Sequence, residues 1–280
     1  MNVRRGFVDV PDGQIHYRES GRDEGGLPLI MLHSNPGSSA MLLPLLDRFG
    51  RHRRVVAPDT LGFGDSTPSR LAEPSIPDYA AATLCALDGL GIERFDLYGS
   101  HTGANMAVEM AIARPDRVNR MVLDGIALYT AAERADYLEN YAPPVLPDAE
   151  GRHLLWTWHF VRDQWLFWPW FKRDKAHRRE LDLPDPTYLN AVVLDVLKSL
   201  GSFRLGYRAS FSYEKETRLP LLRTPTLVAS AESDIFFPQL AEVAALVPDA
   251  ETLVVGGESE VEREEATRRF LAFYETGRAG

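Results

Sequence analysis

The sequence predicts an α/β fold in which a mainly parallel sheet is covered by helices on both faces. Two observations carry this prediction. Strand-like and helix-like segments alternate up to Ala127 and again after Leu219, the pattern of parallel strands joined by crossover helices. Between these points the alternation stops, and the stretch contains all five tryptophans. We therefore expect residues 1–127 and 220–280 to form the core, and residues 128–219 an inserted helical cap.

The elements of the first half follow from hydrophobic periodicity. Residues 14–19 alternate as a half-buried strand, whereas residues 27–32 and 55–57 are short apolar runs typical of fully buried strands. Residues 75–90 predict a helix with one apolar face, and Gly91 is suited to end it. The remaining core elements are strands at 94–98, 121–123, 226–229 and 251–255, and helices at 103–113 and 261–274.

Composition limits the class of partner. Hydrophobic residues at 45% and charged residues at 25% are ordinary for a globular chain. The formal net charge of -9 argues against nucleic acid or an anionic membrane as the main partner, because both require clustered Lys and Arg. We expect a small-molecule substrate and leave a homodimer open.

The N-terminus and the single cysteine refine this expectation. No apolar segment follows Met1 that is long enough for a secretory signal, and none approaches the roughly 18 residues needed to span a bilayer. We expect a soluble, cytoplasmic protein. Cys85 lies beside Leu84 and Leu87 in a helical pattern, so we expect a small core residue, and no disulfide can form within the chain.

The segment Gly99-Ser100-His101-Thr102-Gly103 stands between a predicted strand and a predicted helix. A Gly-x-nucleophile-x-Gly pattern is meaningful in this context, because small flanking residues let strand and helix approach closely around a strained turn. The helix N-terminus then offers backbone N–H groups to an anion. The glycines fix the register, so His101 rather than Ser100 is the central residue.

Two further loops complete a family pattern. They are Leu32-His33-Ser34-Asn35-Pro36-Gly37-Ser38-Ser39 and Ala57-Pro58-Asp59-Thr60-Leu61-Gly62-Phe63-Gly64-Asp65-Ser66. With the elbow, they resemble the haloalkane dehalogenase, epoxide hydrolase and esterase branch of the α/β-hydrolase superfamily. The resemblance implies an α/β-hydrolase fold with a mostly parallel eight-stranded sheet, flanking helices and an inserted helical cap.

The same resemblance has two departures in these loops. The first loop usually reads His-Gly-x-Pro, so Ser34 differs from the pattern. Asn35 resembles the asparagine that holds halide in dehalogenases, but position 101 lacks the aspartate that forms their alkyl-enzyme ester.

The resemblance also locates candidate acids. Asp234 matches the usual triad position after the seventh strand, and Asp124 matches the alternative position after the sixth. The family's histidine should follow the eighth strand, yet the sequence has no histidine after His177. Glu258 is the candidate for the vacated position. The family's usual base is therefore missing.

His101 itself can serve as the base. An imidazole facing Glu258 or an aspartate would form a His–carboxylate pair, in which the carboxylate fixes the tautomer and raises basicity. The backbone N–H groups of Asn35 and Thr102, beside Ser34, would stabilise an oxyanion. The sequence thus predicts a base or nucleophile over an oxyanion hole.

The reaction stays open. Family membership favours ester, lactone or carbon–carbon bond hydrolysis, whereas the missing base favours a lyase, isomerase or cyclase; a silent ligand-binding protein is the alternative from another class. A metal held by His101, Asp124, Asp234 and Glu258 is less favoured, because their spacing matches no metal motif. No cofactor is expected.

The cap tryptophans predict the kind of substrate. Aromatic rings line pockets that bury small apolar ligands, although they can equally form the cap's own core. We expect Trp156, His159 and Trp165 to face the cavity and an apolar or aromatic substrate to bind there.

Overall fold

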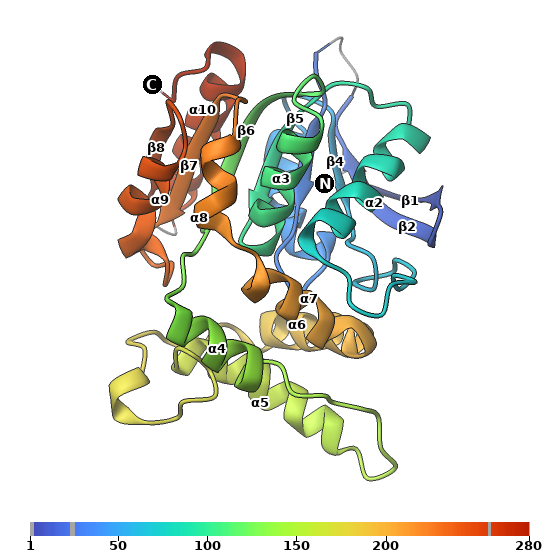
Figure 1. Ribbon diagram of the computed structural model, residues 1–280, viewed down its shortest axis with the longest axis vertical. Coiled ribbons are helices and arrows are strands. Elements are labelled where there is room, and N and C mark those ends of the chain that lie inside the picture. The colour runs from blue at the N-terminus through green and yellow to red at the C-terminus, as the bar shows by residue number, and fades with distance from the viewer. Residues whose placement is uncertain (1–2, 23–25, 257–258, 280) are drawn as a thin grey trace.

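A computed structural model describes residues 3–22, 26–256 and 259–279. At its centre is an eight-stranded sheet in the order β1-β2-β4-β3-β5-β6-β7-β8 (Figure 1). The β1–β2 and β2–β4 pairs are antiparallel, and the other neighbours are parallel. The strands are β1 (Arg4–Val10), β2 (Gly13–Ser20), β3 (Leu29–Leu32), β4 (Val55–Pro58), β5 (Phe95–Ser100), β6 (Val118–Asp124), β7 (Thr226–Ala231) and β8 (Glu251–Val255).

The central strands are buried as their apolar runs predict. Every residue of β3 and of β4 is buried, because helices cover both faces of the sheet there. The carboxyl ends of β5, β6 and β7 lie side by side at one edge, where α/β proteins bind ligands. The sheet thereby brings the segments after Ser100, Asp124 and Ala231 together.

Two helical layers enclose the sheet. The apolar sides of α2, α3 and α9 pack in one core cluster, whereas α1 and α10 pack in a second. Phe270 and Phe273, from the helix predicted at 261–274, are buried in the second cluster. The core helices are α1 (Leu43–Phe49), α2 (Ile76–Gly89), α3 (Thr102–Ala113), α8 (Lys215–Arg218), α9 (Leu240–Leu246) and α10 (Glu260–Thr276).

A helical insertion follows β6. It comprises α4 (Ala131–Asn140), α5 (Arg152–Leu166), α6 (Pro186–Lys198) and α7 (Leu200–Ser212), and Figure 1 shows α4, α5 and α6 beyond one edge of the sheet. These helices have their own core of interlocking aromatic rings. Asp195 of α6 accepts a hydrogen bond from Ser38 Oγ at 2.9 Å, and Lys198 pairs with Asp65 at 2.7 Å, so polar contacts tie the insertion to the core. The bounds 128–219 stay a prediction.

Short 3₁₀ turns complete the elements. They are η1 (Ser39–Leu42), η2 (Lys175–His177), η3 (Leu219–Leu221) and η4 (Phe237–Gln239).

The prediction for Cys85 is wrong, since its side chain is exposed. The buried face of α2 includes Tyr79, Thr83, Leu84 and Leu87. Successive residues of an α-helix are rotated by about 100° from one another. Cys85 is two positions from both Thr83 and Leu87, so it lies about 160° around the helix from each of them and points to solvent.

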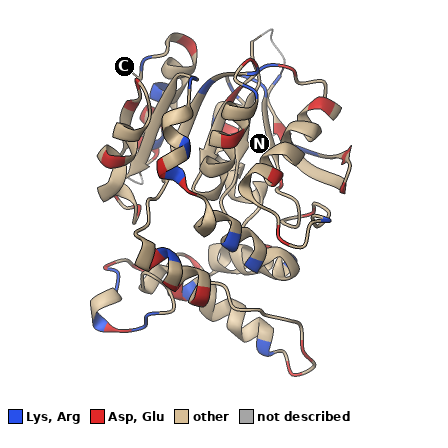
Figure 2. Ribbon diagram, viewed as in Figure 1, with Lys and Arg blue, Asp and Glu red and all other residues tan. Residues whose placement is uncertain are grey.

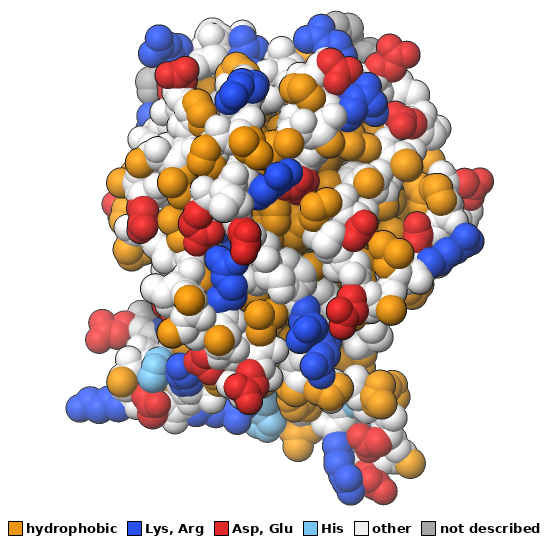
Figure 3. All heavy atoms as spheres, in the orientation of Figure 1, with side chains coloured by type: hydrophobic (Ala, Val, Ile, Leu, Met, Phe, Trp, Pro, Cys, Tyr) orange, Lys and Arg blue, Asp and Glu red, His pale blue; other side chains and the backbone are white. Residues whose placement is uncertain are grey.

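The surface charges are mixed. Acidic and basic residues are both scattered along the ribbon of the core and of the insertion in Figure 2, and apolar side chains lie among charged ones on the face shown in Figure 3. Among the described residues, no helix is long and apolar enough to cross a membrane.

Candidate active site

His101 occupies the turn between β5 and α3. Its backbone is in a strained region at φ 51° and ψ −109°. A side chain on Gly99 would strike the carbonyl of Gly103, and one on Gly103 would strike the carbonyl of Leu32. The two glycines therefore let strand and helix meet closely, as the motif predicts, with His101 at the apex.

Asp234 pairs with this imidazole. Its Oδ2 atom lies 3.0 Å from His101 Nε2. The loop after β7 holds the carboxylate in place, because the Asp234 amide donates to the Ala231 carbonyl at 3.0 Å and Oδ1 accepts from the Phe236 amide at 2.8 Å. Of the two aspartates predicted from the sequence, Asp234 is therefore the one in contact with the ring.

Gly125 makes room for the pair. It has φ +65°, and a Cβ built on it would lie 2.9 Å from His101 Nε2 and 3.0 Å from Asp234 Oδ2. Both the left-handed backbone and the lack of a side chain are required at this position. The ring and the carboxylate thus meet directly above a glycine.

The pairing sets the proton affinity of both groups. Burial disfavours the imidazolium, but the hydrogen bond and charge of Asp234 outweigh it, with Asp124 adding to them, so the pKa of His101 is raised above 6.5. Burial raises the pKa of Asp234, but His101 more than reverses this, and that pKa is lowered below 3.8. When His101 is neutral, its one N–H group is at Nε2 and donates a hydrogen bond to the Asp234 carboxylate. The lone pair that can accept a proton is then on Nδ1.

Asp124 lies at the end of β6 but faces another partner. Its Oδ2 accepts a hydrogen bond from the Tyr98 hydroxyl at 2.6 Å. Burial raises the pKa of Asp124 to about 6, although Tyr98 and the charge of His101 act in the opposite direction. Asp124 thus influences His101 through its charge, while Asp234 makes the hydrogen bond.

The loop after β3 is held in place by a histidine of the motif. His33 Nδ1 donates to the Ser34 carbonyl at 3.0 Å, and His33 Nε2 accepts from the Thr60 amide at 3.0 Å. The Gly37 amide also donates to the Ser34 carbonyl, at 3.1 Å. These bonds fix the backbone that carries Asn35.

Asn35 and Thr102 border the same cavity as His101. Thr102 begins α3, where backbone N–H groups have no partner inside the helix. The Asn35 side-chain oxygen and nitrogen are buried without a hydrogen-bond partner among the described residues. Donors for a developing oxyanion are therefore available beside the imidazole.

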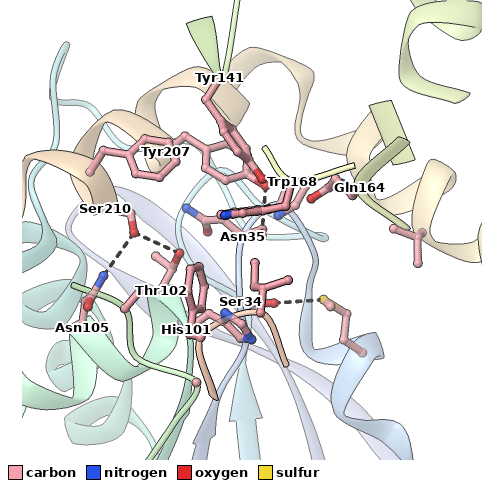
Figure 4. Close-up of a pocket in the computed structure, with 18 of the residues that line it drawn as sticks. Ser34, Asn35, His101, Thr102, Asn105, Tyr141, Gln164, Trp168, Tyr207 and Ser210 are labelled. Carbon is pink, nitrogen blue, oxygen red and sulfur yellow. Dashed lines mark hydrogen bonds between the residues drawn. The ribbon is translucent and has the colours of Figure 1, made fainter. Parts of the chain in front are cut away.

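The cavity has a volume of about 280 Å³ and lies between the core and the helical insertion. Figure 4 shows Ser34, His101 and Thr102 on one side of the cavity and Tyr141 and Tyr207 on the other. Asn35 lies close to Tyr207, whose hydroxyl donates to the Asn35 carbonyl at 3.4 Å. Aromatic side chains form much of the wall, and polar groups such as Asn105, Gln164 and Arg179 lie among them, a combination typical of a site for a small molecule.

Only part of the predicted aromatic wall lines this cavity. Trp165 does, whereas Trp156 stacks on Phe160 with ring centroids 5.2 Å apart and packs inside the insertion. His159 is also not among the described lining residues. Trp156 lies on the side of α5 that packs into the insertion's own core, whereas Trp165 borders the cavity. The two predicted tryptophans therefore have different surroundings.

Several lining residues were not singled out from the sequence, although Trp168 belongs to the set of five tryptophans expected to supply part of the wall. Trp168 lies just after α5, outside any periodic pattern, and packs against Phe236 with centroids 5.4 Å apart. Arg179 and Lys215 read as solvent-exposed charges in polar segments, yet both line the cavity. Their positions follow from tertiary packing.

The less favoured alternative, a metal site that includes His101, Asp124 and Asp234, does not form a cluster among the described residues. The group there whose ligand atoms all lie within 4.8 Å of one another is His16, Asp59 and Asp65, outside this cavity. Asp59 already accepts hydrogen bonds from His16 Nδ1 at 2.7 Å and from the Ser39 amide at 2.7 Å. Glu258, the third carboxylate of that set, lies outside the described residues.

Sequence comparisons identify relatives of known activity. A profile of the family described as "alpha/beta hydrolase fold" matches residues 28–259. The 2-hydroxymuconate semialdehyde hydrolase of Pseudomonas sp. strain CF600 is 37% identical over 146 residues, 49% of this chain and 50% of that protein. Haloalkane dehalogenase 2 of Mycobacterium tuberculosis H37Rv is 33% identical over 146 residues, 50% of this chain and 49% of that protein. The chain spans about half the length of these curated relatives.

Solved structures resemble the whole chain. A thermophilic esterase from Thermogutta terrifontis matches with a TM-score of 0.74 and 18% identity, covering 98% of this chain and 100% of that one. The enol-lactonase of Burkholderia xenovorans LB400 matches with a TM-score of 0.68 and 22% identity, covering 97% and 100%. At these identities the likeness concerns the fold alone.

Proposed function

Because the chain belongs to the α/β-hydrolase fold family, we propose that it is a hydrolase of a small apolar or aromatic carbonyl compound, with His101 as general base. The observation that carries the proposal is the 3.0 Å contact between His101 Nε2 and Asp234 Oδ2 beside a cavity. The ring side chain is 34% exposed, so a substrate or water can reach it. A base within reach of a bound molecule, oriented by a carboxylate, is the minimum for such chemistry.

The chemistry begins with a water molecule in the cavity. Nδ1 of His101 takes a proton from the water as its oxygen adds to the carbonyl carbon. The amides of Asn35 and Thr102 stabilise the resulting oxyanion, and the imidazolium returns the proton to the leaving group. Asp234 stabilises the imidazolium throughout, as its effect on the pKa of His101 indicates.

The relatives suggest the bond that is broken. Two of them are named for 2-hydroxymuconate semialdehyde and for 2-hydroxy-6-oxo-2,4-heptadienoate, both carbonyl compounds, and a structural relative is an enol-lactonase. We propose ester, lactone or carbon–carbon bond hydrolysis for this chain. The second candidate is proton transfer without hydrolysis, as in a lyase, isomerase or cyclase. This second candidate is considered because the elbow has an imidazole at the position where relatives of this fold have a covalent nucleophile.

A substrate panel tests the proposal. Aryl esters, lactones and β-diketones are incubated with the native protein, with His101→Ala and with His159→Ala, whose histidine does not line the cavity. We expect His101→Ala to lower kcat by roughly 10²- to 10⁴-fold and His159→Ala to have little effect. Equal activity in His101→Ala and the native protein would remove His101 from the mechanism. Solvent deuterium entering an unhydrolysed β-diketone would instead support the second candidate.

A nucleophile swap tests the role of the elbow. His101→Ser places the common nucleophile at the apex, but the sequence has no histidine after His177 to activate it. We expect no efficient esterase from this variant with 4-nitrophenyl acetate. Strong activity would show that another group in the cavity acts as the base.

A further inference from the structure

Lys215 is a buried lysine in the wall of the same cavity. Its side chain belongs to α8, and the residue is 3% exposed. The ammonium nitrogen lies 4.5 Å from the centre of the Tyr129 ring and 3.4 Å from the Ser210 carbonyl. No ion pair joins Lys215 to a carboxylate in the described part of the chain. The ammonium nitrogen thus contacts a ring face and one neutral acceptor.

The other lysines are placed differently. Four of the 31 basic residues are lysines. Lys172 pairs with Asp136 at 2.6 Å and Lys198 with Asp65 at 2.7 Å, while Lys175 is exposed. A buried charge without a partner is costly, so a group in this position tends to lose its charge. Lys215 is the lysine whose surroundings favour the neutral amine.

Two physical effects act together on this amine. Burial lowers the pKa of Lys215, the charge of Arg134 lowers it further, and the result is about 7. Glu216 opposes the change but is paired with Arg134 at 3.4 Å. A desolvated lysine near another cation is a recognised form of activated amine nucleophile. A large share of Lys215 therefore carries a free lone pair at neutral pH.

A short polar connection links Lys215 to the elbow. Ser210, whose carbonyl contacts Lys215, receives hydrogen bonds at its Oγ from Asn105 Nδ2 at 3.1 Å and from Thr102 Oγ1 at 3.4 Å. Figure 4 shows Ser210 between Thr102 and Asn105 in the cavity wall. Thr102 directly follows His101, so the amine and the imidazole border one cavity of about 280 Å³.

We propose that Lys215 is an amine nucleophile that forms an imine with an aldehyde or ketone bound in this cavity. Its Nζ lone pair adds to the carbonyl carbon, and a proton passes from nitrogen to the former carbonyl oxygen to give a carbinolamine. Loss of that oxygen as water leaves a carbon–nitrogen double bond. Water reverses the step, so no oxidant, reductant or cofactor is consumed.

The imine would extend the chemistry of the proposed base. A protonated imine withdraws electrons from the neighbouring carbon more strongly than the parent carbonyl group does. His101 could then remove a proton from that carbon. This use of the imine depends on the proposed function of His101, but imine formation requires Lys215 alone, so the two proposals can fail separately.

Reductive trapping of the native protein tests the proposal. The protein is treated with benzaldehyde and sodium cyanoborohydride at pH 7.5, and modified lysines are mapped by mass spectrometry. At that pH an amine with a pKa of about 7 is mostly neutral, whereas an ordinary lysine near 10.4 is neutral in about one molecule in a thousand. We expect Lys215 to be labelled at least tenfold faster than Lys175. The larger fraction of neutral amine at Lys215 outweighs the lower nucleophilicity of an amine with a lower pKa.

The pH profile and three variants complete the test. Labelling of Lys215 should level off above about pH 8, where an amine with a pKa of about 7 is already neutral. His101→Ala should retain the adduct, Lys215→Arg should abolish it at this site, and Lys175→Arg should not alter it. Labelling of Lys215 no faster than that of Lys175 overturns the proposal. The proposal is also overturned if Lys215 is not labelled and the Lys215→Met variant binds benzoate more weakly than the native protein. Lys215 would then bind an anion as a cation.

Discussion

Replacing Gly125 by alanine should disrupt the His101–Asp234 pair. The loss of unfolding free energy should be little more than the cost of placing an alanine in the left-handed backbone conformation of this position. The new methyl group would lie 2.9 Å from His101 Nε2 and 3.0 Å from Asp234 Oδ2, closer than van der Waals contact allows. One partner must move, and the hydrogen bond between them lengthens or breaks. A hydrogen bond to a charged group contributes about 1.5–3 kcal/mol, so we expect roughly a 10- to 150-fold loss of kcat/KM.

Gly91 provides the matched control. It has φ +68°, against +65° for Gly125, but a Cβ there meets nothing within 4 Å. Both alanine variants should lose about 1–2 kcal/mol of unfolding free energy through left-handed strain, as measured by urea denaturation. Only Gly125→Ala should lose activity on a substrate found in the panel and lower the pKa of His101 in an NMR titration. Equal kcat/KM in the two variants, or an unchanged His101 titration, would refute the reasoning.

Three further substitutions test the surroundings of the pair. Asp234→Asn should lower the pKa of His101 and move the acidic limb of the pH–rate profile to lower pH; an unmoved limb would exclude Asp234 as the partner. The contact between ionised Asp234 and protonated His101 stabilises the fold above about pH 3.8, and this stabilisation is lost as the pH rises through the raised pKa of His101. Asp234→Asn should therefore lower the free energy of unfolding more at pH 6 than at pH 9. Tyr98→Phe should cost about 1–3 kcal/mol, and more at pH 8 than at pH 5, because the hydroxyl stabilises ionised Asp124; a cost independent of pH would contradict this. Gly206→Ala should destabilise the protein by about 1–3 kcal/mol through overlap with Asn35 and Phe63, whereas Gly201→Ala in the same helix meets nothing and should not; equal effects would show that the insertion adjusts.

The fold class was predictable because its signals are local. Apolar runs such as residues 29–32 and 55–58 need a sheet covered on both faces, and the strand–turn–helix around His101 shows where the carboxyl edge lies. The family match and the structural relatives confirm an α/β-hydrolase fold with a helical insertion. Cys85 shows the limit of such patterns, because it stands between buried residues in the sequence but on the opposite side of the helix.

The site was only partly predictable, because distances across the fold are not encoded in spacing. His101 and Asp234 were both candidates from motif positions, and the family pattern placed Asp234 at the usual position of the acid and Asp124 at the alternative one without excluding either. The separation depends on Tyr98, whose hydroxyl takes the Asp124 carboxylate. Likewise, the position of Lys215 in the cavity depends on how the end of α7 and the start of α8 pack on the elbow helix, which no local pattern specifies.

The position of His101 explains why a carboxylate partner is required there. An imidazole at the N-terminus of α3 faces the positive end of a helix dipole, and burial adds to the cost of protonating it. Both effects would make it a weak base. Asp234 reverses the balance and raises the pKa above 6.5. The same helix end that opposes a proton on the ring favours negative charge on a substrate oxygen. Together, Asp234 and α3 thus let one turn of chain supply both a competent base and the donors for an oxyanion.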